Sequence, residues 1–372
     1  MTRFDDWLAE QAAHREEHGL TRRLLDSDRG EPLLDLAGND YLGLTRDRRV
    51  VEGAVRATEE FGAGAGASRL VTGTLSIHTI LEHALADFMG FPAALVFSTG
   101  YHANLSAVSA LADEDTLVVS DAHVHASMID ACRLARASVV VVRHNDLDAV
   151  AAAISGRAQP RALVLTESIF SVLGDAAPVT ELAAICAAHD AVLVVDEAHG
   201  LGVAGNDGRG VVQAAGLGWR ADVVVTTTLS KSLGAQGGVV LSSPAVREHL
   251  VNRARPFIYD TGLAPGATGA ALAALGVVRD EPHRVARVNE NAARLAVACG
   301  VEPPAGAVLS VPMPGPRQAV AAVAAAAKQG LRIGCFRPPS TPDAISRLRL
   351  TAHAHHTDEE LEYATKLLHE LI

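Results

Sequence analysis

Seven apolar runs, separated by segments with helical spacing, lie between residues 76 and 255 and constrain the fold more than any other feature. Each run is continuous in Val, Leu and Ile instead of alternating with polar residues, as in strands that are buried on both faces. Strands that alternate with helices predict a mainly parallel seven-stranded sheet covered on both sides, an α/β fold. The runs are AALVFS, TLVVSD, SVVVVRH, RALVLTES, AVLVVDEAH, DVVVTTTLS and GGVVLSS.

The 372 residues are enough for about two domains. Residues 1–60 are predicted to form an N-terminal helical arm and a short strand in LLDLAGNDYLGL, followed by the large α/β domain over residues 61–265. Beyond it the pattern changes to VLSVPM, LRIGCF and SRLRLTAHA with helices between them. This change predicts a smaller α+β domain over residues 266–372.

Composition and charge argue against several classes of function. The formal net charge is −11 and no cluster of Lys or Arg alternates with aromatic residues, so nucleic acid is not an expected partner. The longest weakly apolar segment, LAPGATGAALAALGVV, is shorter than the ~20 residues of a membrane span and contains Pro and Gly. The N-terminus is charged with helical spacing and does not resemble a signal peptide, which predicts a cytoplasmic protein without a membrane partner.

Cysteine and histidine spacing does not predict a metal site. The four cysteines lie far apart, so neither a disulfide nor a bound metal is expected. His123 with His125, and His353 with His355 and His356, are possible ligands in principle, but neither group has a convincing set of carboxylate or cysteine neighbours in the sequence. The second group precedes a predicted helix start and is expected to lie mostly on the surface.

Lysine is rare in this chain: Lys231, Lys328 and Lys366 are the three lysines among 32 basic residues. Unlike arginine, lysine can lose its proton at accessible pH and act as a base or condense with a carbonyl group. Lys328 and Lys366 lie on predicted helices and have structural explanations. Lys231 lies in TTTLSKSLGAQGG, directly after an apolar run, and is the candidate for chemistry; the alternative is a solvated loop lysine.

Reactive side chains gather where the predicted strands end. In a parallel α/β sheet, ligands bind at the carboxyl ends of the strands. Five predicted strands end there in hydroxyl, imidazole, carboxyl or amino groups, at residues 98–101, 121–125, 167–171, 196–199 and 228–231. His125 could be a satisfied core histidine, but its place at this edge favours a functional role.

Two short motifs suggest other functions. DEAH at residues 196–199 is typical of nucleotide-driven helicases, but no lysine stands in the GxxxxGK[ST] loop that such a site needs. GLGVAG at residues 200–205 matches the GxGxxG pattern of dinucleotide sites, yet NDGRG follows it instead of a helix. A nicotinamide-dependent dehydrogenase and a catalytically silent interaction protein are kept as alternatives from other classes.

One cofactor, pyridoxal 5′-phosphate (PLP), needs the combination of residues found here. The combination is a lysine at a strand end, an acid with a histidine three residues after it, and hydroxyl groups around a glycine-rich turn. The lysine condenses with the aldehyde of the cofactor, and a carboxylate keeps the pyridine nitrogen protonated so that the ring accepts electrons. Ser and Thr hydroxyls with backbone N–H groups hold the phosphate. Lys231, Asp196 and His199 are therefore predicted to form the centre of a PLP site.

Seven longer stretches form an ordered set: STGYHANL, DAHVHASMIDA, TESIFSVLGDAAPVTEL, VVDEAHGLGVAGNDGRG, TTTLSKSLGAQGG, RPFIYDTGLAP and RPPSTPDAISRLRLTAHA. Together they resemble the α-oxoamine synthases, a family of PLP enzymes. The likeness extends from about Asn39 to the C-terminus. It implies the fold type I of PLP-dependent transferases and a homodimer whose active sites lie at the subunit interface.

The resemblance implies roles for individual residues, carried over motif by motif. Lys231 would bind the cofactor covalently and then act as the base, while Asp196 would pair with the pyridine nitrogen. His199, helped by Ser171, would hydrogen-bond the phenolic oxygen of the ring, and His125 would stack on its face. The phosphate would be contacted by Gly100, Tyr101, His102 and Thr228, and by Thr261 of the neighbouring subunit.

On the substrate side, the resemblance implies that Arg349 clamps the amino-acid carboxylate with its planar guanidinium. Asn39 and Ser340 match positions near the substrates, and Arg22 or Arg23 matches an arginine at the far end of the acyl chain. The reaction implied is a decarboxylative Claisen condensation of L-alanine with pimeloyl-CoA, or the carrier-protein thioester, in biotin synthesis. Sister enzymes use glycine or serine with other thioesters and share nearly all these residues, so both stay open as alternatives. Alanine and glycine differ by one methyl group, which is worth only ~1–3 kcal/mol in a pocket.

Overall fold

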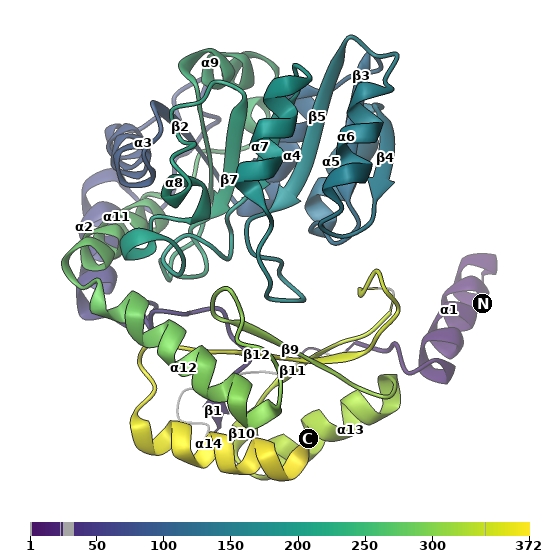
Figure 1. Cartoon of the computed structure of the whole chain (residues 1–372). Helices are drawn as coiled ribbons and strands as arrows, with labels where there is room; N and C mark the ends of the chain where they lie inside the picture. The colour runs from purple at the N-terminus through teal and green to yellow at the C-terminus, as the bar shows by residue number, and fades with distance from the viewer. Residues whose placement is uncertain (1, 23, 25–32, 339) are drawn as a thin grey trace.

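The computed structural model describes residues 2–22, 24, 33–338 and 340–372, which form a large α/β domain and a smaller α+β domain (Figure 1). All seven predicted runs are strands of one sheet, in the order β2-β8-β7-β6-β5-β3-β4. β8 is antiparallel to its neighbours and the other neighbours are parallel, which confirms the predicted mainly parallel α/β fold. The strands are β2 (Ala93–Phe97), β3 (Thr116–Asp121), β4 (Ser138–Val142), β5 (Arg161–Glu167), β6 (Val192–Asp196), β7 (Val223–Thr228) and β8 (Gly238–Ser242).

Neighbouring residues of a strand point to opposite faces of this sheet and enter two separate hydrophobic cores. Val118 of β3 belongs to one core and Val119 to the other. Helices cover both faces because continuous apolar strands leave no polar side for solvent. One face packs against α4 (Gly100–Leu111), α5 (Ala126–Ala135), α9 (Pro244–Arg253) and α10 (Arg255–Ile258), the other against α3 (Ser76–Met89), α6 (Leu147–Ser155), α7 (Val179–Ala188) and α8 (Val211–Ala214).

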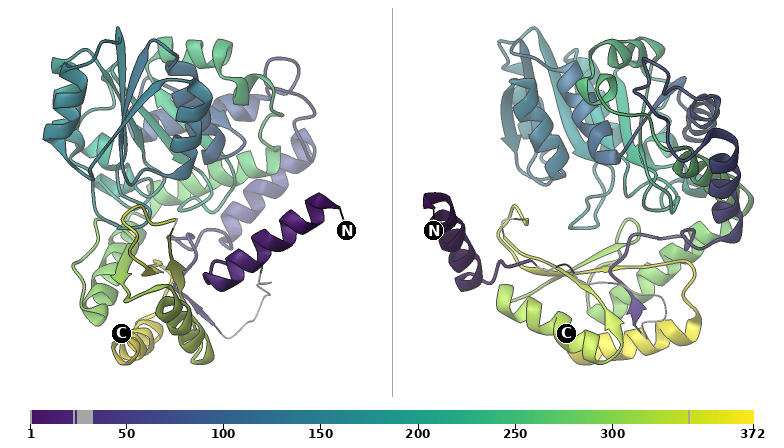
Figure 2. Two further views of the ribbon diagram at one scale, coloured as in Figure 1. Left: turned by 90° about the vertical axis from the view of Figure 1, so that its right-hand side faces the viewer. Right: turned by 180° about the vertical axis from the view of Figure 1, so that it is seen from behind.

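The small domain includes residues from both ends of the chain. Its antiparallel sheet has the order β11-β12-β9, and β1 of the N-terminal segment pairs in parallel with β10. Helix α1 (Arg3–Glu17) buries no residue and stands apart from both domains (Figure 2). The other elements are β1 (Leu34–Asp35), β9 (Val308–Pro312), β10 (Leu331–Arg332), β11 (Gly334–Phe336), β12 (Arg347–Thr351), α12 (His283–Cys299), α13 (Pro316–Lys328) and α14 (Asp358–Leu371).

None of the helices in the described parts of the chain combines the length and the apolar character needed to cross a bilayer.

Helix α2 (Arg48–Phe61) packs along α11 (Pro265–Asp280), and glycines let the two backbones approach closely. A Cβ atom on Gly269 would lie 2.5 Å from the Ala57 Cβ and 2.5 Å from the Gly53 carbonyl oxygen. A Cβ atom on Gly53 would in turn lie 2.7 Å from the Ala273 Cβ. This contact holds α2 against the large domain, directly after the segment that carries Asn39.

The close approach of these helices predicts that Gly269→Ala destabilises the protein by ~1–3 kcal/mol, the usual cost of overpacking. Gly276→Ala, on the same helix, is the matched control because a Cβ atom there meets nothing within 4 Å. Replacing a helical glycine by alanine at such an open position is neutral or stabilises by up to ~1 kcal/mol. Urea unfolding of both variants measures the difference; equal midpoints would show that the helices can move apart at no cost.

Candidate functional site

A cavity of about 260 Å³ opens at the carboxyl ends of the parallel strands. Its walls come from the ends of β5, β6 and β7, from the N-terminus of α4 and from the turn before α5. Eight of the residues predicted from the sequence line it: Gly100, Tyr101, His125, Ser171, Asp196, His199, Thr228 and Lys231. Residues that are up to 131 positions apart in the chain therefore share one small space, as the strand-end reasoning expects.

Lys231 follows β7 and is enclosed except where it faces the cavity. Burial lowers the pKa of its amine to about 8, against the opposing effect of the nearby Asp196 and Glu167 carboxyl groups. Glu167 and Asp196 are partners in register on adjacent strands. Burial, together with the charge of Asp196, raises the pKa of Glu167 to about 8. An amine and an acid with similar pKa values thus lie in one cavity.

Hydrogen bonds fix the Asp196 carboxylate from two sides. Its Oδ2 accepts from Asn104 Nδ2 at 2.7 Å, and its Oδ1 accepts from the backbone N–H of Ala198 at 2.8 Å. Asn104 is itself held, since Nδ2 also donates to Ser127 Oγ and Oδ1 accepts from the Thr226 hydroxyl. Asp196 is therefore a preorganised anion, ready to pair with a cationic nitrogen.

The two predicted imidazoles are held by different partners. His125 caps the N-terminus of α5, and its Nδ1 lies 2.7 Å from Ser127 Oγ. His199 Nδ1 lies 2.7 Å from the hydroxyl oxygen of Tyr41. Burial lowers the pKa of both histidines, and it lowers that of His199 well below the usual value, helped by the charge of Lys231. His199 is therefore neutral and carries one ring proton.

The N-terminus of α4 forms a second wall, suited to an anion. Thr99 caps the helix, with Oγ1 accepting from the His102 N–H at 3.1 Å. A Cβ atom on Gly100 would lie 2.8 Å from the Thr228 Cβ, so only glycine allows β7 and α4 to approach this closely. Free N–H groups and the helix dipole favour a phosphate here.

Two residues predicted at the phosphate end do not line the cavity of their own chain. The His102 ring turns to Asp260, with Nδ1 3.1 Å from Oδ2. Thr261 is exposed and forms a β-bridge with Ser68.

The predicted substrate residues form two groups. Arg349 Nε donates to the Ser171 carbonyl oxygen at 2.8 Å, and both Nη atoms lie 3.3 Å from Asn39 Oδ1. Arg22 Nη2 donates to Ser340 Oγ at 3.1 Å. Arg23 lies outside the described residues. Arg349 and Asn39 therefore adjoin the cavity next to Ser171, while Arg22 and Ser340 form a separate pair.

Arg347, two residues before Arg349 on β12, is equally buried but pairs with Asp343, to which Nη1 donates at 2.8 Å.

Sequence reasoning missed Tyr41, Glu167 and Asn104. Glu167 stands in one of the strand ends singled out above, but its pattern assigns it no role, and nothing local to Tyr41, in LLDLAGNDYLGL, marks it as a site residue. Asn104 is a buried amide on α4, and a polar residue on the sheet-facing side of an apolar helix is the one signal that could have identified it.

A dinucleotide site requires its glycine-rich turn to lead into a helix. GLGVAG is instead a loop that packs on Glu197. The 3-10 helix η1 (Asn206–Gly208) follows it, and a bridge between Leu201 and Arg209 closes it. A Cβ atom on Gly200 would lie 1.7 Å from Glu197 Oε2. Close packing thus explains why glycine is needed in this loop. The motif on which the dehydrogenase alternative depended is not a dinucleotide site.

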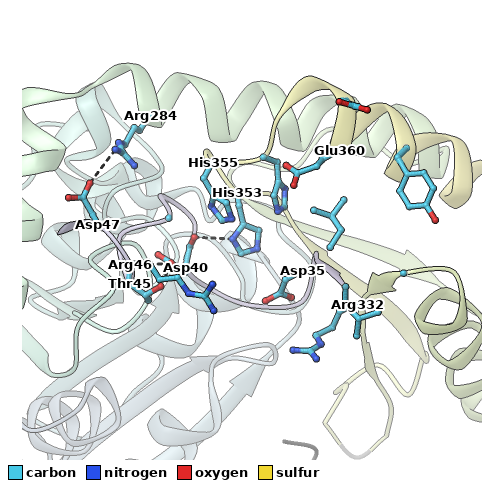
Figure 3. A pocket seen from close by; sticks show the side chains of 17 residues that line it. Asp35, Asp40, Thr45, Arg46, Asp47, Arg284, Arg332, His353, His355 and Glu360 are labelled. Carbon is cyan, nitrogen blue, oxygen red and sulfur yellow. Dashed lines mark hydrogen bonds and ion pairs between the residues drawn. The ribbon is translucent and has the colours of Figure 1, made fainter. Parts of the chain in front are cut away.

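A larger hollow of about 1030 Å³ lies between the N-terminal segment and α14, and none of the predicted site residues lines it (Figure 3). Its charged groups include internal pairs, such as Arg284 with Asp47. Among the described residues, no three His, Cys, Asp or Glu side chains are arranged to hold a metal ion.

The expectation that the histidine group after β12 lies on the surface is wrong for two of its members. His353 and His356 are only 2% and 3% exposed, and His355 alone is exposed. His353 Nδ1 lies 2.9 Å from the Asp40 carbonyl oxygen, as Figure 3 shows, so this ring joins β12 to the N-terminal segment. Burial lowers the pKa of His356 to about 3, which keeps it neutral.

The pKa of Lys231 generates a prediction that needs no cofactor. Carbamoylation by cyanate, which attacks neutral amines, should occur at Lys231 with a midpoint near pH 8, not near the ~10.4 of an ordinary lysine. Asp196→Asn removes a negative charge that raises this pKa, so the midpoint should fall further. Peptide mass spectrometry across a pH series measures it; a midpoint near pH 10, or one that Asp196→Asn leaves unchanged, would contradict the described electrostatics.

Comparison with known proteins agrees with this geometry. The model of the aminotransferase class I and II family matches residues 31–368. The 8-amino-7-oxononanoate synthase of Mycobacterium sp. (strain KMS) is 54% identical over 367 residues, covering 98% of this chain and 96% of that protein.

Two solved structures also match. A serine palmitoyltransferase from S. paucimobilis with PLP and myriocin bound is 31% identical, with a TM-score of 0.91 over 99% of this chain and 97% of that chain. The 8-amino-7-oxononanoate synthase of Francisella tularensis is 26% identical, with a TM-score of 0.79 over 91% of this chain and 97% of that one. The chain belongs to the PLP-dependent aminotransferase class I and II family, on the branch that holds the 8-amino-7-oxononanoate synthases.

Proposed function

We propose that the protein condenses L-alanine with a pimeloyl thioester, either the CoA or the carrier-protein ester, and releases CO2, the free thiol and 8-amino-7-oxononanoate. The observation that carries this proposal is the enclosed Lys231, whose pKa is lowered to about 8, beside the anchored Asp196 in a cavity at the strand ends. The identity of 54% to a relative of that name supports the choice of reaction.

The cavity fits PLP at each of its functional groups. Lys231 would bind the aldehyde carbon. Asp196, whose carboxylate is oriented by two hydrogen bonds, would pair with the ring nitrogen. His125 would pack on the ring, and His199 and Ser171 would face the phenolic oxygen. Thr228 and the N-terminus of α4 would hold the phosphate. When bound, PLP supplies an electron sink that stabilises negative charge on the α-carbon of the amino acid.

Lys231 is suited to move the α-proton. A base with a pKa near the working pH has the largest effect on proton transfer, and the amine pKa is about 8. Glu167, whose pKa is also about 8, can exchange a proton with its surroundings at little energetic cost. The residues of this chain therefore supply a matched donor and acceptor inside the cavity.

Arg349 would bind the amino-acid carboxylate, with Asn39 beside it. Its guanidinium is already oriented by the Ser171 carbonyl and by the Asn39 side chain. A planar, bidentate partner fixes the plane of a carboxylate, which selects the α-carbon bond that stands perpendicular to the cofactor ring. Arg22 and Ser340, paired with each other, would meet the acyl substrate, and Arg23 is the second candidate for this contact.

A second copy of the chain would complete the site. Thr261 is exposed and lies outside the cavity of its own chain, so its proposed phosphate contact must come from a neighbouring subunit. Mixing Lys231→Ala chains with Thr261→Ala chains should restore activity, because mixed dimers contain one site with both residues. Sedimentation as a monomer at micromolar concentration would contradict this arrangement. We place the reaction in the cytoplasm, with small molecules as the other partners.

The choice of amino acid is tested by product analysis. The PLP-loaded protein is incubated with pimeloyl-CoA and, separately, with alanine, glycine or serine, and the products are quantified by mass spectrometry. Alanine should give the most product at equal concentrations. A larger yield from serine or glycine would assign the chain to a sister reaction, and no condensation with any of the three would overturn the proposal.

Arg349 and Arg347 form a matched pair for testing the carboxylate clamp. Arg349→Lys replaces a planar fork by a point charge and should weaken alanine binding about 10- to 100-fold, equivalent to the ~1.5–3 kcal/mol of a charge-assisted hydrogen bond. Arg347→Lys should leave binding nearly unchanged because Arg347 pairs with Asp343. Alanine is titrated against the cofactor absorbance of both variants. Equal affinities, or a larger loss in Arg347→Lys, would remove Arg349 from its proposed role.

A further inference from the structure

The hydroxyl group of Tyr41 lies between the two halves of the site. Tyr41 belongs to the N-terminal segment and is fully buried, and its oxygen lies 2.7 Å from His199 Nδ1 and 3.0 Å from Asn39 Oδ1. Burial raises the pKa of its phenol to about 12, against the opposing effect of the neighbouring Arg349 guanidinium, so the hydroxyl keeps its proton at neutral pH. That single proton can be donated to only one of the two neighbours.

Asn39 Oδ1 already accepts hydrogen bonds from another residue, Arg349. Both Nη atoms of Arg349 lie 3.3 Å from it, and a carbonyl oxygen has two lone pairs. A cationic donor competes better for them than a neutral hydroxyl does. The shorter contact of Tyr41 is with His199 Nδ1, so the arrangement with fewest conflicts has Arg349 donating to Asn39 and Tyr41 donating to His199.

The position of the ring proton on His199 then follows. His199 is neutral and carries its proton on one nitrogen. If Nδ1 accepts from Tyr41, the proton must be on Nε2. Within the described residues Nε2 has no hydrogen-bond partner, and His199 lines the cavity. The nitrogen that remains available to a ligand is therefore a donor.

We propose that Tyr41 is a positioning residue that sets the tautomer of His199, and that Arg349 keeps the Tyr41 hydroxyl directed at His199 by occupying Asn39. The chain Arg349–Asn39–Tyr41–His199 connects β12 of the small domain to the loop after β6 in the large domain. If the proposed function is correct, it links the clamp for the substrate carboxylate to the donor that faces the phenolic oxygen of the cofactor. The tautomer itself is a property of the protein without cofactor or substrate.

The test is histidine NMR on the full chain without cofactor. Two-bond ¹H–¹⁵N spectra of protein labelled with ¹⁵N-histidine distinguish protonated from unprotonated ring nitrogens, and the loss of one signal set in His199→Gln assigns His199 among the 16 histidines. The unmutated protein should show Nε2 protonated and Nδ1 unprotonated, with the Nδ1 resonance shifted by an accepted hydrogen bond. Tyr41→Phe should move Nδ1 to the position of a nitrogen without that bond.

Two further variants make the test specific. Asn39→Asp offers more lone pairs and a negative charge, so it should draw the Tyr41 proton away and transfer the His199 proton to Nδ1. Tyr363→Phe is the matched control, because its hydroxyl donates to the Gln329 carbonyl oxygen on the far side of the small domain, and it should leave the His199 signals unchanged.

The outcomes separate this inference from the proposed function. A protonated Nδ1 in the unmutated protein, or an Nδ1 resonance that Tyr41→Phe leaves in place, would overturn the role of Tyr41. If Tyr41→Phe does not fold, Asn39→Asp decides, and an unchanged tautomer there would overturn the link through Asn39. None of these readouts depends on which substrates the enzyme uses, so a failed product analysis leaves them valid.

Discussion

The rest of the site depends on one constraint: the amine of Lys231 lies in the same cavity as the carboxyl groups of Glu167 and Asp196. Burial disfavours the charged form of each group, so the amine of Lys231 binds its proton less tightly and the carboxyl of Glu167 more tightly than in water. Hydrogen bonds from Asn104 and a backbone N–H fix the Asp196 carboxyl group in place beside them. A lysine can be neutral near physiological pH only in such surroundings, and a neutral lysine is what a covalent cofactor site needs.

The sheet supplies this enclosure through its topology. Parallel strands end at one edge, and β5 and β6 place Glu167 and Asp196 side by side in register. The small domain and the N-terminal segment close the other side with Arg349, Asn39 and Tyr41. The site therefore needs both domains, and the helix contact between α2 and α11 keeps the N-terminal segment in place between them.

The features of the fold and the site that the sequence predicts are those with a local signal in the chain. Seven runs of Val, Leu and Ile predict seven strands, and a scarce lysine after one of them predicts the chemistry at Lys231. The parts that sequence reasoning missed depend on contacts between distant segments. Asn104 meets Asp196 across 92 residues and Tyr41 meets His199 across 158, and neither pairing has a pattern within its own segment. His353 and His356 were misplaced for the same reason, because the N-terminal segment that covers them lies more than 300 residues away.

The claim that Lys231 anchors the cofactor is tested most directly by a single covalent measurement. The PLP-loaded protein is reduced with borohydride, digested and mapped by mass spectrometry. We expect a pyridoxyl group on Lys231, at about one equivalent per chain, and none on the exposed Lys328 and Lys366. A modification on Lys328 or Lys366 with Lys231 unmodified would contradict this claim.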